Sequence, residues 1–281
     1  MVNQPPIIFF GNGPLADFAL PILAETCEIL FHARTRDDLA TVAELKRQHP
    51  DAIGILASFG VLIKADLLAL FEPVGILNIH PSLLPKYRGA SPIESAILAG
   101  DRDFSYSIMK LAPAMDAGPI YHQETFTDLP LDKTTIYQKL AEAGADWLAK
   151  HLRELSASQL VPTPQDDSQA TFTTKLDKSM SLLNPSAHSA EQIYRQIVAF
   201  QDFPKPKYEF FGKTCIIRQA HVLNITDVLC EAAGAAENSP LMLKCADQNY
   251  VVIDELQPEG KKPMDARSFI NGYGKTQSSS H

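Results

Sequence analysis

Short apolar runs alternate with amphipathic stretches along the first half of the chain. This alternation is typical of a parallel sheet flanked by helices. The apolar runs predict strands at Ile7–Phe10, Glu28–Ala33, Ala52–Ser58, Gly75–Ile79 and Tyr106–Leu111. The stretches between them predict helices at Leu15–Ala24, Asp37–Arg47, Ala65–Leu70 and Ser91–Leu98. A longer helix, from about Thr134 to Arg153, carries apolar residues at helical spacing and is expected to close an α/β domain.

The pattern changes after that helix. Residues 156–171 are rich in Ser, Gln, Pro and Asp, and we interpret 156–175 as a linker between domains at 1–155 and 176–281. The second part has one helix at Ala190–Phe200 and another near Asp265–Asn271. Its alternating runs predict strands at Lys207–Phe211, Thr214–Val222, Leu241–Cys245 and Tyr250–Leu256. Several short strands separated by turns predict a small β-barrel.

Charge is divided unevenly between these two parts. The 281 residues include 25 Lys and Arg against 33 Asp and Glu, a net charge of −8, so the chain lacks the overall basic excess of dedicated nucleic-acid binders. Residues 1–170 hold 13 basic and 21 acidic residues, whereas residues 171–281 hold 12 of each. The balanced second part therefore stays compatible with a nucleic-acid substrate. Its basic residues form either a basic face or an ordinary solvated surface: Lys205, Lys207, Lys213, Arg218, Lys261 and Lys262.

Cysteine spacing and hydropathy give no sign of a metal centre, a disulfide framework or a membrane segment. Cys27, Cys215, Cys230 and Cys245 include no CxxC pair, so we expect reduced thiols and no metal. The longest run without charge or proline, Ala52–Ile63, is too short to span a membrane. The first residues carry no positive stretch, so a cytoplasmic location without a membrane partner is the expectation.

A glycine-rich turn, Gly11 to Ala16, follows the first strand and satisfies the pattern G-x-G-x-x-A. A dinucleotide site would need an acidic residue after the second strand, but Arg34 lies in that region. An NADP site could use this arginine. The turn is otherwise interpreted as the tight strand-to-helix connection of any α/β domain.

Polar side chains at the end of the fourth predicted strand are the stronger candidates for chemistry. The period of two puts Asn78 and His80 on one face, and Pro81 ends the strand just after them. Ligands of α/β folds bind at the carboxyl ends of such strands. Asp116 lies in the loop after the next strand, and near His80 it would pair a carboxylate with an imidazole in one cleft.

These residues fall within two longer motifs. The run Leu77-Asn78-Ile79-His80-Pro81-Ser82-Leu83-Leu84-Pro85-Lys86-Tyr87-Arg88-Gly89, followed by Met115-Asp116-Ala117-Gly118, resembles the signature of the 10-formyltetrahydrofolate-dependent formyltransferases. The resemblance implies a Rossmann-like catalytic domain followed by an OB-like barrel. It makes Asn78, His80 and Asp116 the catalytic residues. It also implies folate contacts by Ser82, Leu83, Leu84 and Pro85, by Ser58, Phe59, Gly60, Val61 and Leu62, and by Ala112, Pro113, Ala114 and Met115.

The second half extends the resemblance to the family members that formylate initiator methionyl-tRNA. Its similar segments are Thr171 to Leu176, Ile197 to Pro204 and Leu256 to Met264. Only 17 residues separate Arg34 from Ala52, where those members usually carry a longer segment with a basic loop. The implied acceptor is initiator methionyl-tRNA. An amino-sugar nucleotide is the alternative acceptor, and a non-catalytic NADP- or folate-binding protein is the third hypothesis.

The implied reaction is formyl transfer from 10-formyltetrahydrofolate to a primary amine. A tetrahedral oxyanion develops and needs hydrogen-bond donors, a role expected of Asn78 and of protonated His80. Asp116 would hold or charge His80 and relay a proton. Neither a metal, an acyl-enzyme nor an obligate protein partner is expected.

Overall fold

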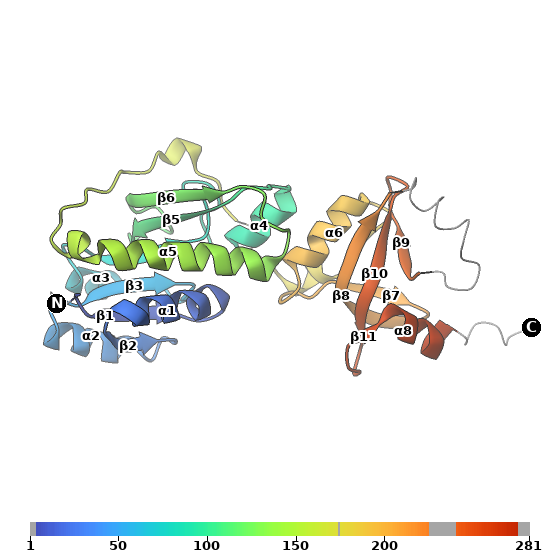
Figure 1. Cartoon of the computed structure of the whole chain (residues 1–281), viewed down its shortest axis with the longest axis horizontal. Coiled ribbons are helices and arrows are strands. Elements are labelled where there is room, and N and C mark those ends of the chain that lie inside the picture. The colour runs from blue at the N-terminus through green and yellow to red at the C-terminus, as the bar shows by residue number, and fades with distance from the viewer. Residues whose placement is uncertain (1–3, 174, 225–239, 275–281) are drawn as a thin grey trace, which may run out of the picture. The chain divides into compact units, whose positions relative to one another are not determined.

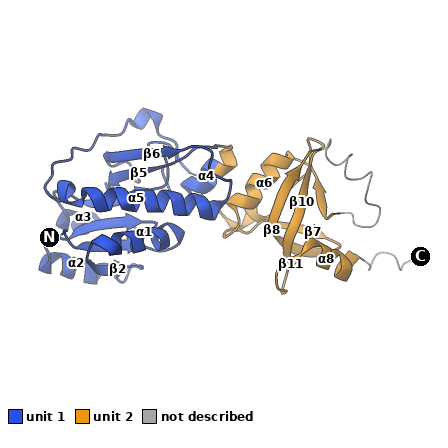
Figure 2. Ribbon diagram, in the orientation of Figure 1, with its two compact units in different colours: residues 1–96, 101–174 blue, residues 97–100, 175–281 orange. Residues whose placement is uncertain are grey.

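The computed structural model describes residues 4–173, 175–224 and 240–274 (Figure 1). They group into two units, residues 1–96 with 101–174 and residues 97–100 with 175–281 (Figure 2). Cys27, Cys215 and Cys245 are buried free thiols, and burial raises the pKa of Cys215 and Cys245 to about 11. Cys230 lies outside the described residues. None of the described helices is long and apolar enough to cross a membrane.

A six-stranded sheet forms the centre of the first unit, in the order β2-β1-β3-β4-β5-β6. The strands are β1 (Ile7–Gly11), β2 (Ile29–Ala33), β3 (Ile53–Ala57), β4 (Ile76–His80), β5 (Phe104–Lys110) and β6 (Ile120–Phe126). The first four in chain order pair in parallel, as the alternating apolar runs predict. The predicted α/β class is therefore confirmed.

The end of this sheet differs from the sequence prediction. The strand expected at Tyr106–Leu111 belongs to β5, which runs antiparallel to β4 and sets Ser107 opposite His80. It turns back through residues 111–119 into β6, a strand that the hydropathy pattern did not predict. β6 lies at the edge of the sheet and its side chains are half-buried or exposed, so it lacks a continuous apolar run. The sheet is therefore mixed rather than wholly parallel.

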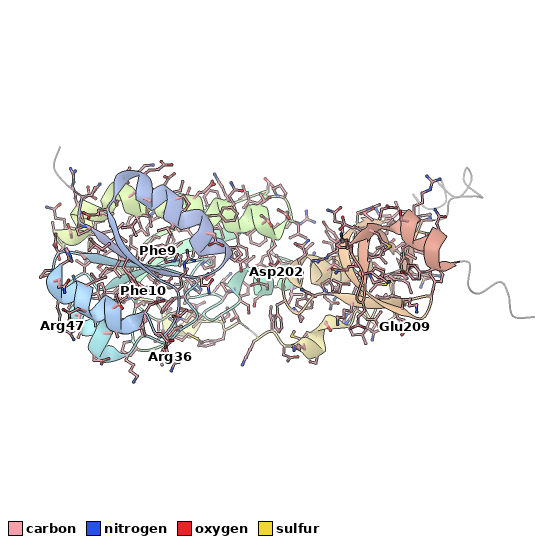
Figure 3. All side chains as sticks on the ribbon, turned by 90° about the horizontal axis from the view of Figure 1, so that it is seen from below. Phe9, Phe10, Arg36, Arg47, Asp202 and Glu209 are labelled. Carbon is pink, nitrogen blue, oxygen red and sulfur yellow. The ribbon has the colours of Figure 1, made fainter. Side chains whose placement is uncertain are left out.

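Helices cover the sheet: α1 (Pro14–Thr26), α2 (Leu39–Gln48), α3 (Ala65–Leu70), α4 (Pro92–Ala99) and α5 (Lys133–Ser156). α1 packs against α5, and a separate apolar cluster joins β1 and β3 to α2 and α3. Phe9 and Phe10 lie inside this unit, whereas Arg36 and Arg47 lie at its periphery (Figure 3). In α5, Gly144 allows a close approach to β4, because an added Cβ would lie 2.7 Å from Ile79 Cγ2.

The second unit is a curled antiparallel half-barrel with helices on its inner face. Its strands are β7 (Lys207–Phe210), β8 (Lys213–Leu223), β9 (Met242–Lys244), β10 (Tyr250–Pro258) and β11 (Met264–Asp265). They follow the order β11-β10-β8-β7, and β9 also pairs with β10. Ile193 and Ile197 of α6 (Ala190–Ala199) and Phe269 of α8 (Ala266–Tyr273) pack into its core. The predicted small β-unit after the α/β unit is confirmed.

Candidate active site

Strand β4 carries two polar side chains near its end and is otherwise apolar. Ile76, Leu77 and Ile79 are fully buried, whereas Asn78 and His80 are 5% and 4% exposed. Burying polar groups without partners is unfavourable, so each needs a hydrogen-bonding role. The Asn78 carboxamide makes no hydrogen bond to any described residue, and it lines a cavity. It is therefore available to a bound molecule.

The two ring nitrogens of His80 have different partners. Nε2 lies 3.1 Å from the carbonyl oxygen of Tyr87, and because a carbonyl only accepts, Nε2 carries a proton and donates it. Nδ1 lies 3.8 Å from Asp116 Oδ2. In a neutral ring Nδ1 then holds a lone pair directed toward the carboxylate. Nδ1 is therefore the atom that can gain a proton.

The charge state of His80 is set mainly by its burial. Removal from water lowers the pKa of His80 below its ordinary value of 6.5. The Asp116 charge and the hydrogen bond to the Tyr87 carbonyl oppose this effect without overcoming it. The imidazole is therefore neutral at pH 7 before a substrate binds. The sequence-based mechanism expected a protonated ring.

Asp116 projects from the loop between β5 and β6 and is held by the backbone. Its Oδ2 accepts a hydrogen bond of 2.7 Å from the Gly89 amide. Its own φ of 50° lies in the left-handed region, which is uncommon for residues other than glycine but which Asp adopts more readily than most. At Gly118, two residues later, an added Cβ would collide with the Lys110 carbonyl. The tight loop thus requires glycine there to bring Asp116 to His80.

Asn78, His80 and Asp116 line one cavity of about 270 Å³. Ser58, Phe59 and Gly60, from the loop after β3, line the same cavity. Its remaining walls are Leu56, Ile79, Pro81, Gly89, Ala90, Pro92 and Tyr137. The structure therefore brings together all three residues assigned to catalysis and the first half of one folate segment.

The rest of that segment and the loop before Asp116 lie elsewhere. Val61 packs on the apolar cluster beneath α2 and α3, and Leu62, 75% exposed, lines a separate hollow of about 460 Å³ beside these helices. Ala112 is half-buried, and the residues after it, Pro113, Ala114 and Met115, are exposed. None of these residues lines the cavity of His80.

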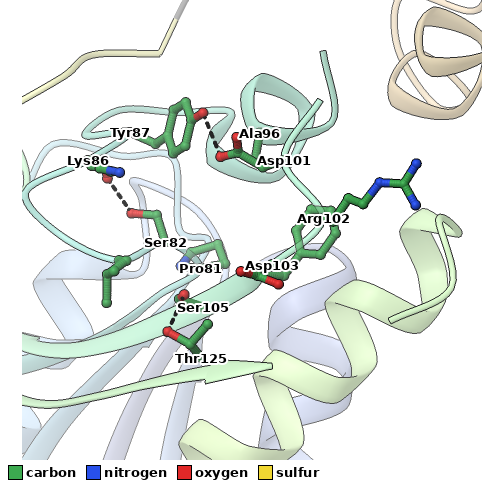
Figure 4. A pocket seen from close by; sticks show the side chains of 12 residues that line it. Pro81, Ser82, Lys86, Tyr87, Ala96, Asp101, Arg102, Asp103, Ser105 and Thr125 are labelled. Carbon is green, nitrogen blue, oxygen red and sulfur yellow. Dashed lines mark hydrogen bonds between the residues drawn. The ribbon is translucent and has the colours of Figure 1, made fainter. Parts of the chain in front are cut away.

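The loop from Ser82 to Pro85 does not line the cavity of His80. Ser82 and Leu83 line a second cavity of about 270 Å³, which Figure 4 shows together with the hydrogen bond from Tyr87 to Asp101. Leu84 is buried and its amide donates to the Ser107 hydroxyl, while Pro85 is half-buried. Hydrogen bonds to β5 thus fix the path of this loop.

Tyr137 is the cavity residue that sequence reasoning missed most clearly. It lies in the first turn of α5, and its hydroxyl donates to Glu94 Oε1 at 3.1 Å. Lys133 Nζ lies 3.5 Å from the same oxygen. No motif marked Tyr137, because its place at the site depends on how α5 packs on the sheet.

The glycine-rich turn has a packing role in this structure. An added Cβ at Gly11 would lie 2.6 Å from the Ala57 carbonyl oxygen and from Ala16 Cβ. Gly13, at φ 100°, precedes Pro14 at the start of α1. The close contacts of Gly11 and the positive φ of Gly13 explain both glycines without a bound dinucleotide. Among the described residues, no group of three or more His, Cys, Asp or Glu could hold a metal ion.

Comparison with known proteins identifies the family. Residues 11–152 match the formyl transferase family, and residues 175–274 match the formyl transferase C-terminal domain. The chain is 36% identical over 233 residues to the methionyl-tRNA formyltransferase of Dictyoglomus thermophilum, covering 82% of this chain and 74% of that protein. The chain belongs to the formyltransferase family.

Two solved structures share its fold at low sequence identity. HypX from Aquifex aeolicus in complex with tetrahydrofolic acid has a TM-score of 0.71 at 16% identity, over 96% of this chain and 47% of that one. The sugar 3N-formyl transferase WlaRD has a TM-score of 0.64 at 15% identity, over 92% of this chain and 100% of that one. The family resemblance stated on the sequence motifs is thus confirmed.

Proposed function

We propose that this formyltransferase transfers the formyl group of 10-formyltetrahydrofolate to the free amino group of initiator methionyl-tRNA. The observation that carries the proposal is one cavity lined by Asn78, His80 and Asp116. Its carboxamide makes no hydrogen bond to the described part of the chain, and the imidazole Nδ1 faces the carboxylate. The proposal includes the cytoplasm as the place of reaction, because translation supplies the acceptor there.

In this mechanism the amine nitrogen attacks the formyl carbon and forms the new C–N bond. The formyl oxygen becomes an oxyanion, and the bond from the formyl carbon to folate N10 then breaks. The Asn78 amide donates to that oxygen as charge develops. Loss of one such donor typically lowers turnover by about a hundredfold to a thousandfold.

One proton must move from the attacking amine to the departing N10. His80 begins neutral and accepts this proton at Nδ1, then returns it to N10. The resulting imidazolium presents an Nδ1–H toward Asp116 Oδ2, whose negative charge stabilises it. The charged form of His80 thus arises during the reaction, and the step needs no metal and no covalent enzyme intermediate.

We assign the folate contacts to the three predicted segments. Ser58, Phe59 and Gly60 line the same cavity as Asn78, His80 and Asp116, which we call the reaction cavity. Each segment also exposes one large apolar side chain: Leu62 (75%), Leu83 (40%) and Met115 (60%). Leu62 and Leu83 line two different hollows, so the support for this assignment is the family resemblance together with Ser58, Phe59 and Gly60 in the cavity of His80.

The acceptor is the part of the proposal that needs a direct test. Methionyl-tRNA is favoured by the sequence relative named for it and by the matching C-terminal domain. An amino-sugar nucleotide is favoured by the fold shared with WlaRD and by the short segment after Arg34. The two acceptors differ in size and charge, so they are readily compared.

The protein should be incubated with the formyl donor and, in parallel, with methionyl-tRNA or amino-sugar nucleotides. We expect formyl-methionyl-tRNA as the main product. His80→Ala and Asp116→Ala should each lose most transfer while retaining the fold and folate affinity, measured by circular dichroism and equilibrium binding. Preferred formylation of a nucleotide sugar would replace the proposed acceptor, and near-normal transfer by either variant would reject the mechanism.

A further inference from the structure

A segment within the predicted linker, Thr163–Thr173, lies against the loop after β4 and the loop between β5 and β6, and we call this segment the strap. The two loops are called the catalytic loops below. At one end, Thr163 and Ile120 exchange two backbone hydrogen bonds of 2.8 Å. At the other end, the Thr171 amide donates to the Pro85 carbonyl, and the Arg88 amide donates to the Thr171 carbonyl. The strap thus connects the start of β6 with the loop that follows β4.

Gln165 is the strap residue that contacts both catalytic loops. Its Nε2 donates to the backbone carbonyls of Asp116 at 2.8 Å and Gly118 at 2.7 Å. Its Oε1 accepts from Arg88 Nε at 3.0 Å and Arg88 Nη2 at 2.7 Å. A glutamine amide offers two donors and two acceptor positions. This side chain therefore uses its whole hydrogen-bonding capacity at the site.

The two loops that Gln165 joins are the ones that meet at Asp116. Arg88 is nearly fully buried and precedes Gly89, whose amide donates to Asp116 Oδ2. Asp116 itself has a left-handed backbone conformation, which is uncommon outside glycine and persists only where the surrounding structure holds it. Gln165 fixes the carbonyl of this residue on one side and Arg88 on the other. Displacing Gln165 would weaken the support of the carboxylate and leave the Gly89 amide as its direct hydrogen-bond donor.

We propose that Gln165 is a positioning residue that holds the Asp116 carboxylate in register with His80 Nδ1. It acts through the carbonyls of Asp116 and Gly118, since it does not line the cavity. The inference rests on the proposed function for its kinetic consequence. Its structural part, the placement of Asp116 beside His80, can be measured without any formyl transfer.

Gln165→Glu is the sharpest variant because it separates the two sets of bonds. It keeps the length and the acceptors for Arg88, but it replaces the donating NH2 by an oxygen that repels both carbonyls. Gln165→Met, of similar size, removes all four bonds without adding charge. Asp167→Ala is the matched control, because Asp167 is exposed and accepts from Arg88 Nη2 but does not contact the Asp116 loop.

The experiment measures steady-state transfer, thermal unfolding and the His80 titration by NMR in the full-length protein. We expect Gln165→Glu and Gln165→Met to lower kcat about ten- to a hundredfold, with KM within twofold, as for a small misplacement of a reacting group. In Gln165→Met the His80 pKa should fall further, because the Asp116 charge moves away and no new charge is added. Asp167→Ala should change neither quantity by more than about twofold.

Unchanged kcat in a folded Gln165 variant would overturn the inference. So would a loss of activity that follows only the loss of folded protein, with His80 titrating as in the parent. If the parent protein transfers no formyl group to methionyl-tRNA, the proposed function fails instead. In that case the His80 titration of Gln165→Met against Asp167→Ala still decides the inference.

Discussion

The two ring nitrogens of His80 have different partners and different proposed roles. His80 Nε2 is committed to the Tyr87 carbonyl, so its tautomer is fixed before any substrate arrives. Nδ1 faces Asp116 and is left to exchange the proton of the reaction. Fixing the tautomer and orienting the ring is a familiar way of preparing a histidine for general base catalysis.

The pH dependence of transfer follows from this arrangement. We expect kcat/KM to rise with pH through an enzyme ionisation whose midpoint lies below 6.5, separate from the ionisation of the acceptor amine, whose ordinary pKa is about 7.7–8.0. The reason is that burial lowers the pKa of His80 and only the neutral ring can accept the proton. The contribution of the neutral ring is therefore lost as pH falls through the lowered pKa and is present above it. A pH–rate profile of the parent protein measures the midpoint.

Asp116→Asn serves as the companion variant for that profile. Removing the carboxylate charge, which raises the His80 pKa, should move the His80 titration to still lower pH. NMR titration of the imidazole is the measurement, since the variant transfers slowly. A parent midpoint above 6.5, or an upward shift in the variant, contradicts this account of the site.

The sequence predicts the proposed reacting residues better than it predicts the residues packed or hydrogen-bonded around them. Asn78 and His80 are recognisable because a strand period of two and Pro81 fix their face and position. Tyr137 and Gln165 carry no such local signal. Gln165 reaches the Asp116 carbonyl across 49 positions of the chain, a contact that only tertiary packing creates.

Among the elements, the packing of α5 on β4 bears most directly on the site, because β4 carries Asn78 and His80. Gly144 of α5 lies over Ile79, the residue between Asn78 and His80. The sequence predicted both elements from their periodicity. It could not predict the close approach of β4 and α5, because that approach depends on a glycine at position 144 rather than on the hydropathy pattern. β6 was missed for a related reason, since a half-exposed edge strand has no apolar pattern.

Gly144→Ala tests that contact. We expect a loss of about 1–3 kcal/mol of unfolding free energy, because the new methyl group would lie 2.7 Å from Ile79 Cγ2. Gly272→Ala is the matched control: this glycine lies in α8 with no heavy atom within 4 Å of an added Cβ. The control should gain up to about 1 kcal/mol from helix propensity. Denaturant unfolding measures both, and equal effects would reject the packing argument.

At the scale of the whole molecule, charge and chemistry are separated between the two units. The acidic excess belongs to residues 1–170, which contain the reaction cavity. The outer face of the second unit's sheet carries Lys207 and Gln257, which both pair with Ile216, and Arg218 donates to Gln257 Oε1 at 2.8 Å. Lys261 follows in the next turn. These cations are our candidates for contacts with tRNA phosphates.

The salt dependence of tRNA binding tests this assignment. Each phosphate contact contributes about 0.7–0.9 to the slope of log K against log salt. The double variant Lys207→Ala, Lys261→Ala should therefore bind methionyl-tRNA more weakly and with a slope shallower by about 1.4–1.8. Lys244→Ala, an exposed lysine of β9, is the control and should leave the slope unchanged. Binding isotherms at several salt concentrations provide the slopes, and equal slopes for all three proteins would exclude this face.

The strap also affects where this chain could be joined to a related formyltransferase in a chimera. Helix α5 ends at Ser156, which looks like a natural point for a crossover. A chimera joined there would inherit Asn78, His80 and Asp116 but would leave Gln165 to the other parent. The smallest exchangeable catalytic block therefore extends to Thr173, seventeen residues past the helix. A segment that resembles a spacer would therefore have to be transferred together with the residues whose loops it contacts.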